Sequence, residues 1–360
     1  MSLSLQIGTK IYQLSNLPEV SDINLLEGKT ISFCRNWMAG QPSFEIQTSG
    51  STGVPKKIFI ERKSMIASAM ATAQAIELQA SQTSLVCLDT GYIAGMMMLV
   101  RSMEVGMNMV VVEPSANPFE FVNTKSSVDF AALVPYQVKS ILDLPQAGWF
   151  NQLKTILIGG APLDLVTKKA LRNYSCTFYE TYGMTETISH IALKKLNGSD
   201  LTDYFKALPR IVVQQDERGC LCIKAPYLVE EIVTNDVVEF RSPEEFLWLG
   251  RWDNVINSGG VKVFPERTEE KISKLFSELQ IQNRFFIAGL PDSMLGQAVT
   301  LIVEGFLTPD QESQIRENLK KSLFKYEIPR SVEFVKVFTE TATGKINRSI
   351  STSLIVNQTS

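Results

Sequence analysis

The amino-acid sequence predicts an α/β protein, in which a large N-terminal α/β body with a β-rich portion is followed by a small α+β C-terminal domain. Between residues 56 and 183, short apolar runs alternate with stretches of helical periodicity. This pattern is typical of a mostly parallel sheet with helices on both faces. From about residue 205 the runs become shorter and alternate in polarity, which indicates a region of shorter alternating strands. We place the domains at residues 1–252 and 253–360.

The strands of the first body are expected where uninterrupted apolar runs occur between turn or helix signals. One helix is predicted to begin near Ser64, a residue type that caps helices well. A second, strongly apolar helix is predicted over residues 92–100. The strands are predicted at residues 57–60, 85–88, 109–112, 130–134, 156–158 and 177–179.

The C-terminal domain is predicted to contain two helices and three further strands. Pro265 is expected to open the first helix, because apolar side chains follow it at i, i+3, i+4 and i+7 spacing. The second helix is predicted over residues 309–326. The strands are predicted at residues 284–288, 298–304 and 331–337.

Composition excludes two classes of function. The chain has 360 residues, with 35 basic and 38 acidic side chains and a formal net charge of -3. Nucleic-acid binding requires a basic surface that neutralises phosphates, so we expect no nucleic-acid partner. His190 is the single histidine, which argues against His-based relays and His-rich zinc sites. An enzyme of this composition is expected to use lysines, carboxylates, hydroxyls and backbone amides.

Cysteine usage and apolar runs indicate the cellular compartment. No C-x-x-C pair occurs, and the chain begins without a basic stretch followed by a long apolar run. The apolar run over residues 92–100 is about half the length that a bilayer span needs. We therefore expect a cytoplasmic protein without a membrane span, and leave open whether it forms a homodimer. The cysteines predicted to be small buried residues are Cys34, Cys87, Cys176, Cys220 and Cys222.

A segment rich in hydroxyls and glycine is the strongest local signal in the chain. Glycines let the backbone turn its amides inward and a lysine adds positive charge, so such a segment can hold a polyphosphate. Pro55 stands where a Walker A loop requires glycine, which excludes an ordinary P-loop. The alternative is a surface loop without a ligand. The predicted phosphate-binding residues are Thr48, Ser49, Gly50, Ser51, Thr52, Gly53 and Lys56.

This segment resembles the phosphate-binding loop of the adenylate-forming superfamily, which includes acyl-CoA synthetases, peptide-synthetase adenylation domains and luciferases. Four further segments resemble motifs of that superfamily in the same order along about 300 residues. Five ordered matches make the resemblance specific. The four segments are residues 182–186 (Y-G-x-T-E), 234–236 (T-G-D), 250–253 with 260–263 (hinge) and 343–346 (C-terminal lysine).

The resemblance implies a nucleotide site built from several strand ends. Thr185 is expected to contact the α-phosphate, and Glu186 to hold Mg²⁺, which prefers oxygen ligands. Asp236 is expected to accept the ribose hydroxyls with Arg251 beside it, and Asn235 replaces the usual glycine. The remaining expected contacts are Gly160 and Ala161 against the adenine, and Tyr182 and Gly183 at a turn after a strand.

The resemblance also assigns roles in the C-terminal domain. Lys345 is expected to stabilise negative charge on the reacting carboxylate and the α-phosphate. The domain is expected to act as a mobile lid that rotates about Asp253 and admits coenzyme A past Gly259 and Gly260. Taken alone, Lys345 would be interpreted as a solvated surface charge.

The implied activity is that of an acid–thiol ligase that uses ATP, Mg²⁺ and coenzyme A. A carboxylate attacks the α-phosphorus of ATP and releases pyrophosphate, and the thiol of coenzyme A then displaces AMP. Charge neutralisation and positioning suffice for both steps. The predicted catalytic residues are Lys56, Thr185, Glu186 and Lys345.

The substrate is predicted from a narrower resemblance. Residues 133–137, 180–186 and 189–192 are similar to segments of short bacterial o-succinylbenzoate–CoA ligases of menaquinone synthesis. That acid keeps a second carboxylate, so its pocket should contain a cation or several donors. The pocket candidates are Tyr92, Arg101 and His190.

Three alternatives remain open at this point. The chain could be a CoA ligase for another aryl or medium-chain acid, or an adenylating enzyme that passes its acyl group to a carrier protein. It could also be a noncatalytic nucleotide-binding protein. Retention of Lys56, Glu186, Asp236 and Lys345 argues against this last alternative.

Overall fold

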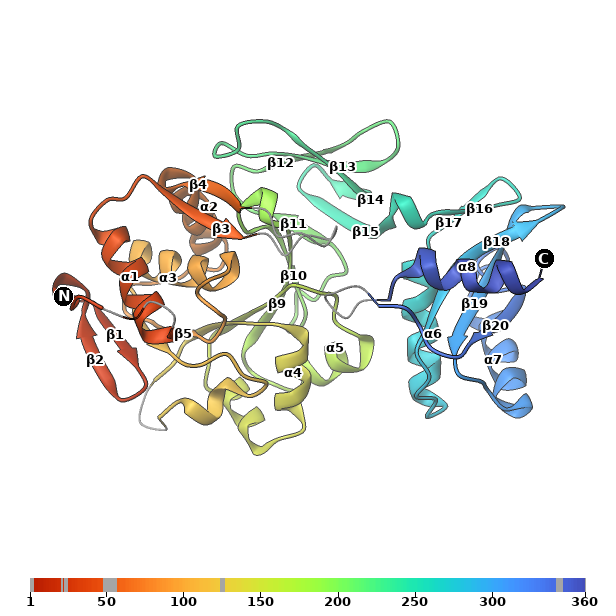
Figure 1. Cartoon of the computed structure of the whole chain (residues 1–360), viewed down its shortest axis with the longest axis horizontal. Coiled ribbons are helices and arrows are strands. Elements are labelled where there is room, and N and C mark those ends of the chain that lie inside the picture. The colour runs from red at the N-terminus through yellow and green to blue at the C-terminus, as the bar shows by residue number, and fades with distance from the viewer. Residues whose placement is uncertain are drawn as a thin grey trace.

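A computed structural model describes residues 3–20, 22, 25–47, 57–123, 127–340 and 346–359 of the chain. Within these residues, the elements up to β15 form a larger part, and the elements from β16 onward form a smaller part beside it (Figure 1). The helices are α1 (Leu26–Met38), α2 (Arg62–Ala75), α3 (Ile93–Val105), α4 (Pro135–Leu142), α5 (Leu165–Leu171), α6 (Pro265–Glu278), α7 (Pro309–Ser322) and α8 (Arg348–Thr359).

The strands divide into a large sheet, a two-stranded sheet and a C-terminal sheet. The large sheet contains β1 (Ser4–Ile7), β2 (Lys10–Gln13), β5 (Thr83–Val86), β6 (Asn108–Val111), β7 (Phe130–Leu133), β8 (Thr155–Ile158), β9 (Thr177–Gly183), β10 (His190–Lys195), β11 (Phe205–Ala207), β12 (Val212–Gln215), β13 (Cys220–Lys224), β14 (Ile232–Ser242) and β15 (Glu245–Arg251). The two-stranded sheet pairs β3 (Ser43–Gln47) with β4 (Lys57–Glu61), and the C-terminal sheet contains β16 (Ile256–Ser258), β17 (Val261–Val263), β18 (Phe285–Asp292), β19 (Gly296–Glu304) and β20 (Ser331–Val335).

The large sheet is mixed, with a parallel centre and an antiparallel flank. Its order among the described strands is β12-β13-β14-β15-β11-β10-β9-β8-β7-β5-β6-β1-β2. The strands from β9 to β1 in this order are parallel, and those from β12 to β10 are joined by antiparallel pairings. This arrangement confirms the predicted α/β class. The antiparallel pairing begins where β10 meets β9.

Successive residues of the central strands point into two different cores. Val86 and Leu157 face a core shared with α1, α2 and α3, whereas Leu85 and Ile156 face a core shared with α4. Side chains alternate across a strand, so strands that are apolar on both faces must be covered on both sides. The uninterrupted apolar runs of the sequence therefore correspond to a sheet with helices on each face (Figure 1).

The smaller part has its own apolar centre. Helices α6 and α7 bury Ile272, Phe276 and Ile315 against one side of β18 and β19, and α8 buries Ile355 against the other side. β18 and β19 are antiparallel, whereas β20 runs parallel to β19. The larger and smaller parts meet where α6 contacts β15 and α5.

Several element boundaries differ from the predictions for physical reasons. β4 lies outside the large sheet, because it pairs with the preceding strand β3. α2 begins at Arg62 rather than Ser64, which is buried inside its first turn. α3 continues to Val105, where Gly106 adopts φ 84° and ends the helix. The helix predicted to end at residue 326 stops at Ser322.

The cysteines behave as predicted from their spacing. All five are free and buried, and burial raises the pKa of Cys34 and of Cys87 to about 12. Such thiols remain protonated and serve as small apolar residues. In the described part of the chain, every helix is too short or too polar to cross a bilayer.

Candidate active site

The segment at residues 182–186 lies where β9 leads into a 3-10 turn, η4 (Thr185–Thr187), and then into β10. Tyr182 and Gly183 are the last residues of β9, not the turn that the sequence predicted. The reason is that Gly183 pairs with His190 across the two strands. A Cβ atom at position 183 would lie 2.4 Å from the Cα atom of His190, so only glycine allows this pairing. The chain reverses after Gly183 instead.

Asp236 on β14 is held from two directions. The Tyr182 hydroxyl donates a hydrogen bond to Asp236 Oδ2 at 2.6 Å, and the Trp248 indole N–H donates to Asp236 Oδ1 at 3.2 Å. β15, β11 and β10 lie between β14 and β9 in the sheet, so the sheet must curl for this contact to form (Figure 1). Burial and the Asp236 charge raise the pKa of Tyr182, which keeps its hydroxyl a donor.

The predicted hinge residue Asp253 lies beside this carboxylate. Arg251 Nη2 is 3.1 Å from Asp253 Oδ2, and Arg251 Nη1 is 3.9 Å from Asp236 Oδ1. Asn235 Nδ2 donates to Asp253 Oδ2 at 3.3 Å and its side-chain oxygen accepts from Arg218 at 2.9 Å. Asn235 therefore sits within a continuous strand rather than in a turn, and its side chain links β14 to the connection between the two parts.

Gly160 and Ala161 follow β8 at the same sheet edge. β8 and β9 are parallel neighbours, so both strands end on the side where Tyr182 lies. Gly160 and Ala161 are exposed there, and Gly160 adopts φ 91°. A Cβ atom at Gly159 would lie 2.2 Å from Thr181 Oγ1, so the backbone after β8 lies directly against β9. The structure thus brings Gly160, Ala161, Tyr182 and Asp236 to one edge of the sheet.

Thr185 and Glu186 project away from the core. Glu186 is exposed and Thr185 is partly exposed. Among the described residues, no hydrogen bond or ion pair occupies the Glu186 carboxylate, which leaves both oxygens available to a hard cation. One carboxylate together with substrate phosphates is a common way to bind Mg²⁺, so the donor set fits that ion. No cluster of three metal-ligating side chains occurs in the described part of the chain.

Arg101 lies inside α3, not beyond its end as predicted, and is 2% exposed. Its Nη1 donates to the Met98 sulfur at 3.4 Å, and its Nε has no hydrogen-bond partner within the described residues. No acidic side chain there forms an ion pair with it. Burial lowers the pKa of Arg101 to about 10, so the guanidinium remains charged at neutral pH.

His190 lies close enough to Arg101 for the guanidinium charge to affect the pKa of the imidazole. The His190 Nε2 atom is 2.9 Å from Thr72 Oγ1 on α2, and its Nδ1 is 3.3 Å from Ser189 Oγ. Burial, together with the charge of Arg101, lowers the pKa of His190 well below its ordinary value. The single imidazole is therefore neutral. Tyr92, the third pocket candidate, caps α3 and is 51% exposed.

Gly259 and Gly260 form the two-residue turn between β16 and β17. Both have positive φ angles, 59° and 82°, and Ser258 pairs with Val261 across the turn. A two-residue hairpin favours this geometry, and glycine adopts it without strain. Their backbone role explains both glycines without coenzyme A. The other predicted residues, Thr48 to Gly53, Lys56 and Lys345, lie outside the described residues.

The sequence reasoning missed three polar features near these sites. Trp248 and Thr72 have no local motif, because their partners are distant in sequence. The third feature is Glu180, which is buried on β9 and lies 2.8 Å from Lys194 and 3.4 Å from Lys168. Although burial opposes its ionisation, the two lysines hold the pKa of Glu180 below its ordinary value. Lys168 also lies 3.6 Å from Glu270 on α6, which links the larger and smaller parts.

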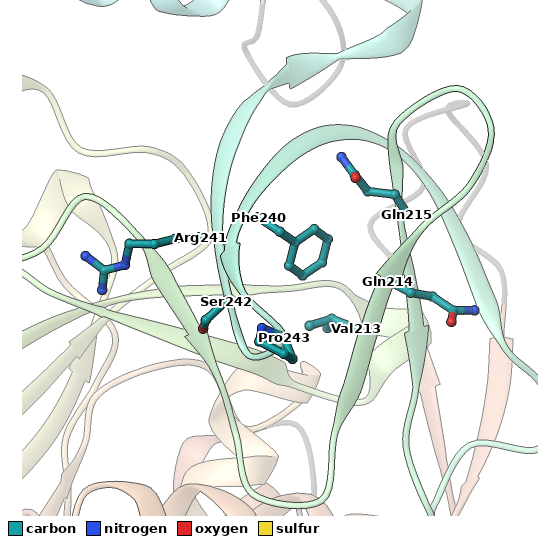
Figure 2. Close-up of a pocket in the computed structure, with 7 residues that line it drawn as sticks. All are labelled: Val213, Gln214, Gln215, Phe240, Arg241, Ser242 and Pro243. Carbon is teal, nitrogen blue, oxygen red and sulfur yellow. The ribbon is translucent and has the colours of Figure 1, made fainter.

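A pocket of about 280 Å³ lies elsewhere, between β12 and the turn that joins β14 to β15. Figure 2 shows Phe240, Val213 and Pro243 gathered at its centre, with Arg241 pointing away. Arg241 is already paired with Glu245 at 2.8 Å. None of the residues predicted from the motifs lines this pocket, and it offers no uncommitted charge to a ligand.

Comparison with known proteins adds independent information. The family model for AMP-binding enzymes matches residues 27–229. An acyl-CoA synthetase (AMP-forming)/AMP-acid ligase II-like protein from Dyadobacter fermentans DSM 18053 has a solved structure that is 37% identical in sequence. That match covers 95% of this chain and 97% of the other, with a TM-score of 0.66.

Two further relatives carry more specific names. The 2-succinylbenzoate–CoA ligase of Bacillus mycoides (strain KBAB4) is 24% identical, over 94% of this chain and 76% of that protein. The o-succinylbenzoate coenzyme A synthetase from Bacillus subtilis, solved with ATP and magnesium ion, is 21% identical. The match covers 86% of this chain and 69% of that chain, with a TM-score of 0.69. At this identity, the second likeness shows the fold alone.

Proposed function

The chain belongs to the family of AMP-binding enzymes, and from this premise we propose that it uses ATP to join o-succinylbenzoate to coenzyme A. The family assigns the broader activity, that of an AMP-forming acyl-CoA ligase. We infer the choice of acid from a further feature of the structure. One observation carries it, namely that Arg101 is a fully buried cation without an acidic partner in the described residues.

The described edge of the sheet supports a nucleotide site. Asp236 accepts one hydrogen bond at each oxygen, and a carboxylate has further lone pairs for the two ribose hydroxyls. Gly160 and Ala161 are exposed at this edge, and glycine permits close approach of the adenine to the backbone. We assign the α-phosphate to Thr185, because it is partly exposed in the turn that follows β9 at the same edge. The phosphate loop at residues 48–56 is proposed to hold the remaining phosphates.

The first half-reaction joins the acid to AMP. The carboxylate of the acid attacks the α-phosphorus, the bond to the leaving phosphate breaks, and pyrophosphate departs. Glu186 would hold Mg²⁺, which neutralises phosphate charge when it is bound. Lys56 and Lys345 are proposed to stabilise the charge that develops on the phosphate and the carboxylate oxygens. No proton transfer is required in this step.

The second half-reaction transfers the acyl group to the thiol of coenzyme A and releases AMP. We propose that residues 253–360 move about Asp253 between the two steps, withdrawing Lys345 and opening a path beside Gly259 and Gly260. The contacts between the two parts are compatible with such a motion. They include α6 against β15 and α5, the partly exposed pair Lys168–Glu270, and Val255 and Phe264 packed beside Leu249.

Arg101 suits the second carboxylate of the substrate. A buried charge is costly unless it is paired, and a guanidinium can donate two parallel hydrogen bonds to one carboxylate. Thr72 and the neutral His190 add polar atoms near this position without competing for the anion. An acid that carries a carboxylate at both ends could therefore be activated at one end and recognised at the other.

The test is pyrophosphate release with ATP, Mg²⁺ and a panel of acids, followed by addition of coenzyme A and detection of the thioester. We expect o-succinylbenzoate to give the highest kcat/KM, and benzoate and octanoate to give little product. Release with those acids but not with o-succinylbenzoate would contradict the substrate. No release with any acid would contradict the enzymatic proposal itself.

Arg101 can be tested separately through specificity. In Arg101→Met we expect kcat/KM for o-succinylbenzoate to fall about 10- to 100-fold, the loss typical of a hydrogen bond to a charged group. The rate with an analogue that lacks the second carboxylate should change much less. Equal losses of kcat/KM for both acids would show that Arg101 does not recognise the second carboxylate.

A further inference from the structure

The turn that follows Glu186 has an unusual backbone. Ile188 adopts φ 69° and ψ -48°, although it is β-branched and buried. The Ser189 N–H donates to the Thr187 carbonyl at 2.8 Å, so Ile188 is the central residue of a γ-turn with positive φ. This turn type is rare and strained, and a β-branched residue is disfavoured in this region of backbone space.

The surrounding structure holds this turn in place. The Thr187 hydroxyl accepts a hydrogen bond from the Met184 N–H at 3.0 Å. The same oxygen lies 2.9 Å from the Met184 carbonyl and 2.7 Å from the Ser189 carbonyl, either of which can accept its proton. Thr187 is completely buried. One hydroxyl therefore ties together the first and last residues of the reversal between β9 and β10.

The strands and the core prevent the reversal from relaxing. Gly183 and His190 are paired at its two ends without space for a Cβ atom at position 183. The Ile188 side chain is 5% exposed and packs into the main core together with Ile191. Residues 184–189 must therefore reverse the chain direction between the fixed ends of β9 and β10. Thr187 and Ile188 occupy the inward positions of this reversal.

This arrangement of the turn places the two preceding residues, Thr185 and Glu186, on the outside. Because Thr187 and Ile188 point inward, Thr185 and Glu186 are presented at the sheet edge, with the Glu186 carboxylate unoccupied by any described side chain. Strained backbone that the surrounding structure maintains is characteristic of functional sites, where it preorganises ligand contacts.

We propose that Thr187 and Ile188 are positioning residues, which hold Thr185 and Glu186 in the geometry that binds Mg²⁺-ATP. This inference rests on the proposed roles of Thr185 and Glu186. It does not depend on the identity of the acid, because the turn lies on the nucleotide side of the site. Neither residue is proposed to touch the nucleotide.

The experiment measures Mg²⁺-dependent ATP binding by titration calorimetry, without acid or coenzyme A. In Thr187→Val, which keeps the side-chain shape but removes the hydroxyl, we expect the affinity for ATP in excess Mg²⁺ to fall about tenfold. Thr187→Ser should recover most of that loss, because it restores the hydroxyl. Ile188→Gly is a second route, since glycine adopts the turn freely but also every alternative to it, and we expect a loss of about threefold to tenfold.

A double-mutant cycle distinguishes positioning from general damage. Glu186→Gln alone should weaken the same Mg²⁺-dependent binding, and adding Thr187→Val should cause little further loss, because both changes disable one contact. Additive losses, an equally weak Thr187→Ser, or unchanged affinity in both Thr187→Val and Ile188→Gly would overturn the proposal. If the wild-type chain binds Mg²⁺-ATP but releases no pyrophosphate with any acid, the proposed function fails while this test still decides the role of the turn.

Discussion

Two buried polar groups in the larger part of the molecule are organised in opposite ways. In the first, which we call the Asp236 group, Tyr182 and Trp248 each donate a hydrogen bond to Asp236. In the second, the Arg101 group, Thr72 contacts His190 while the nearby Arg101 lacks both an acidic partner and a bond at Nε within the described residues. The first group is complete without a ligand, whereas the second leaves a buried charge unbalanced.

This difference indicates how the two ends of the proposed site divide their tasks. A satisfied network fixes its own geometry and contributes to stability. An unbalanced buried cation lowers stability until an anion arrives. The Asp236 group is thus suited to the invariant substrate, ATP, and the Arg101 group to selecting an acid. Substitutions in the two groups should consequently have opposite effects on stability.

Asp236→Asn should have the largest effect. The amide removes the charge and replaces one of the two oxygens that accept from Tyr182 and Trp248 by a donor group, so we expect the free energy of unfolding to fall by about 1–3 kcal/mol. The KM for ATP should rise about 100-fold, because two ribose contacts to a charged acceptor weaken together. Urea unfolding and steady-state kinetics measure these quantities.

Tyr182→Phe is the matched control, since it removes one donor but leaves the Asp236 charge. We expect a loss of about 1 kcal/mol in stability and a rise in the KM for ATP below tenfold. An Asp236→Asn variant that binds ATP as well as Tyr182→Phe would contradict the assigned role of the carboxylate.

Arg101→Met should act in the opposite direction on stability. Replacing an unpaired buried cation by an apolar side chain is expected to raise the free energy of unfolding of the unliganded protein by about 1–2 kcal/mol. Arg101→Lys retains the charge and should bring no such gain. Thermal and urea unfolding at neutral pH provide the measurement, and a marked destabilisation by Arg101→Met would show that the Arg101 group is balanced after all.

The pH dependence of stability should report His190. In the folded protein the pKa of His190 lies below the ordinary value of 6.5. Below pH 6.5 the unfolded chain therefore binds a proton at this residue, whereas the folded chain does not. The free energy of unfolding should therefore fall as the pH decreases from 6.5 to 5, with about 1.5 kcal/mol of the loss due to this group.

His190→Gln provides the comparison for that titration, because the chain has no other histidine. The variant should lose stability less steeply over the same interval, while carboxylates contribute equally to both proteins. Parallel curves for the two proteins would be incompatible with a buried neutral imidazole.

Glu270→Gln should have the smallest effect. The Glu270 side chain is 47% exposed and lies 3.6 Å from Lys168, and such a pair contributes about 0.2–1 kcal/mol. We expect little change in global unfolding, but faster proteolysis at the connection near residues 252–255 if the two parts separate more often. A matched Glu278→Gln, which alters a pair within α6, should leave that rate unchanged.

Local patterns predicted the central strands and four of the helices, but few of the contacts between elements. Uninterrupted apolar runs identified the central strands correctly, because strands covered on both faces need apolar residues at every position. The same pattern could not show that β4 pairs with β3 outside the large sheet. It also could not show that Tyr182 continues β9, since that depends on Gly183 meeting His190.

The site shows the same division between local and distant information. The motif residues Tyr182, Gly160 and Asp236 do meet at one edge, but the curl of the sheet that joins them is a property of the thirteen described strands together. Trp248 could not be identified, because a tryptophan in an alternating strand is usually a packing residue. Arg101 was named from the sequence, yet only burial reveals that its charge is unbalanced.

The indole of Trp248 also allows the Asp236 group to be followed by intrinsic fluorescence. Of the four tryptophans, Trp37 and Trp149 are buried at 1% and 8% exposure in apolar cores. Trp248 donates to Asp236, and Trp252 lies 4.7 Å from the Lys262 ammonium of the smaller part. Two of the intrinsic fluorophores therefore stand at the proposed nucleotide site and at the connection between the parts. Emission from single-tryptophan variants could follow nucleotide arrival and movement of the connection as separate optical signals.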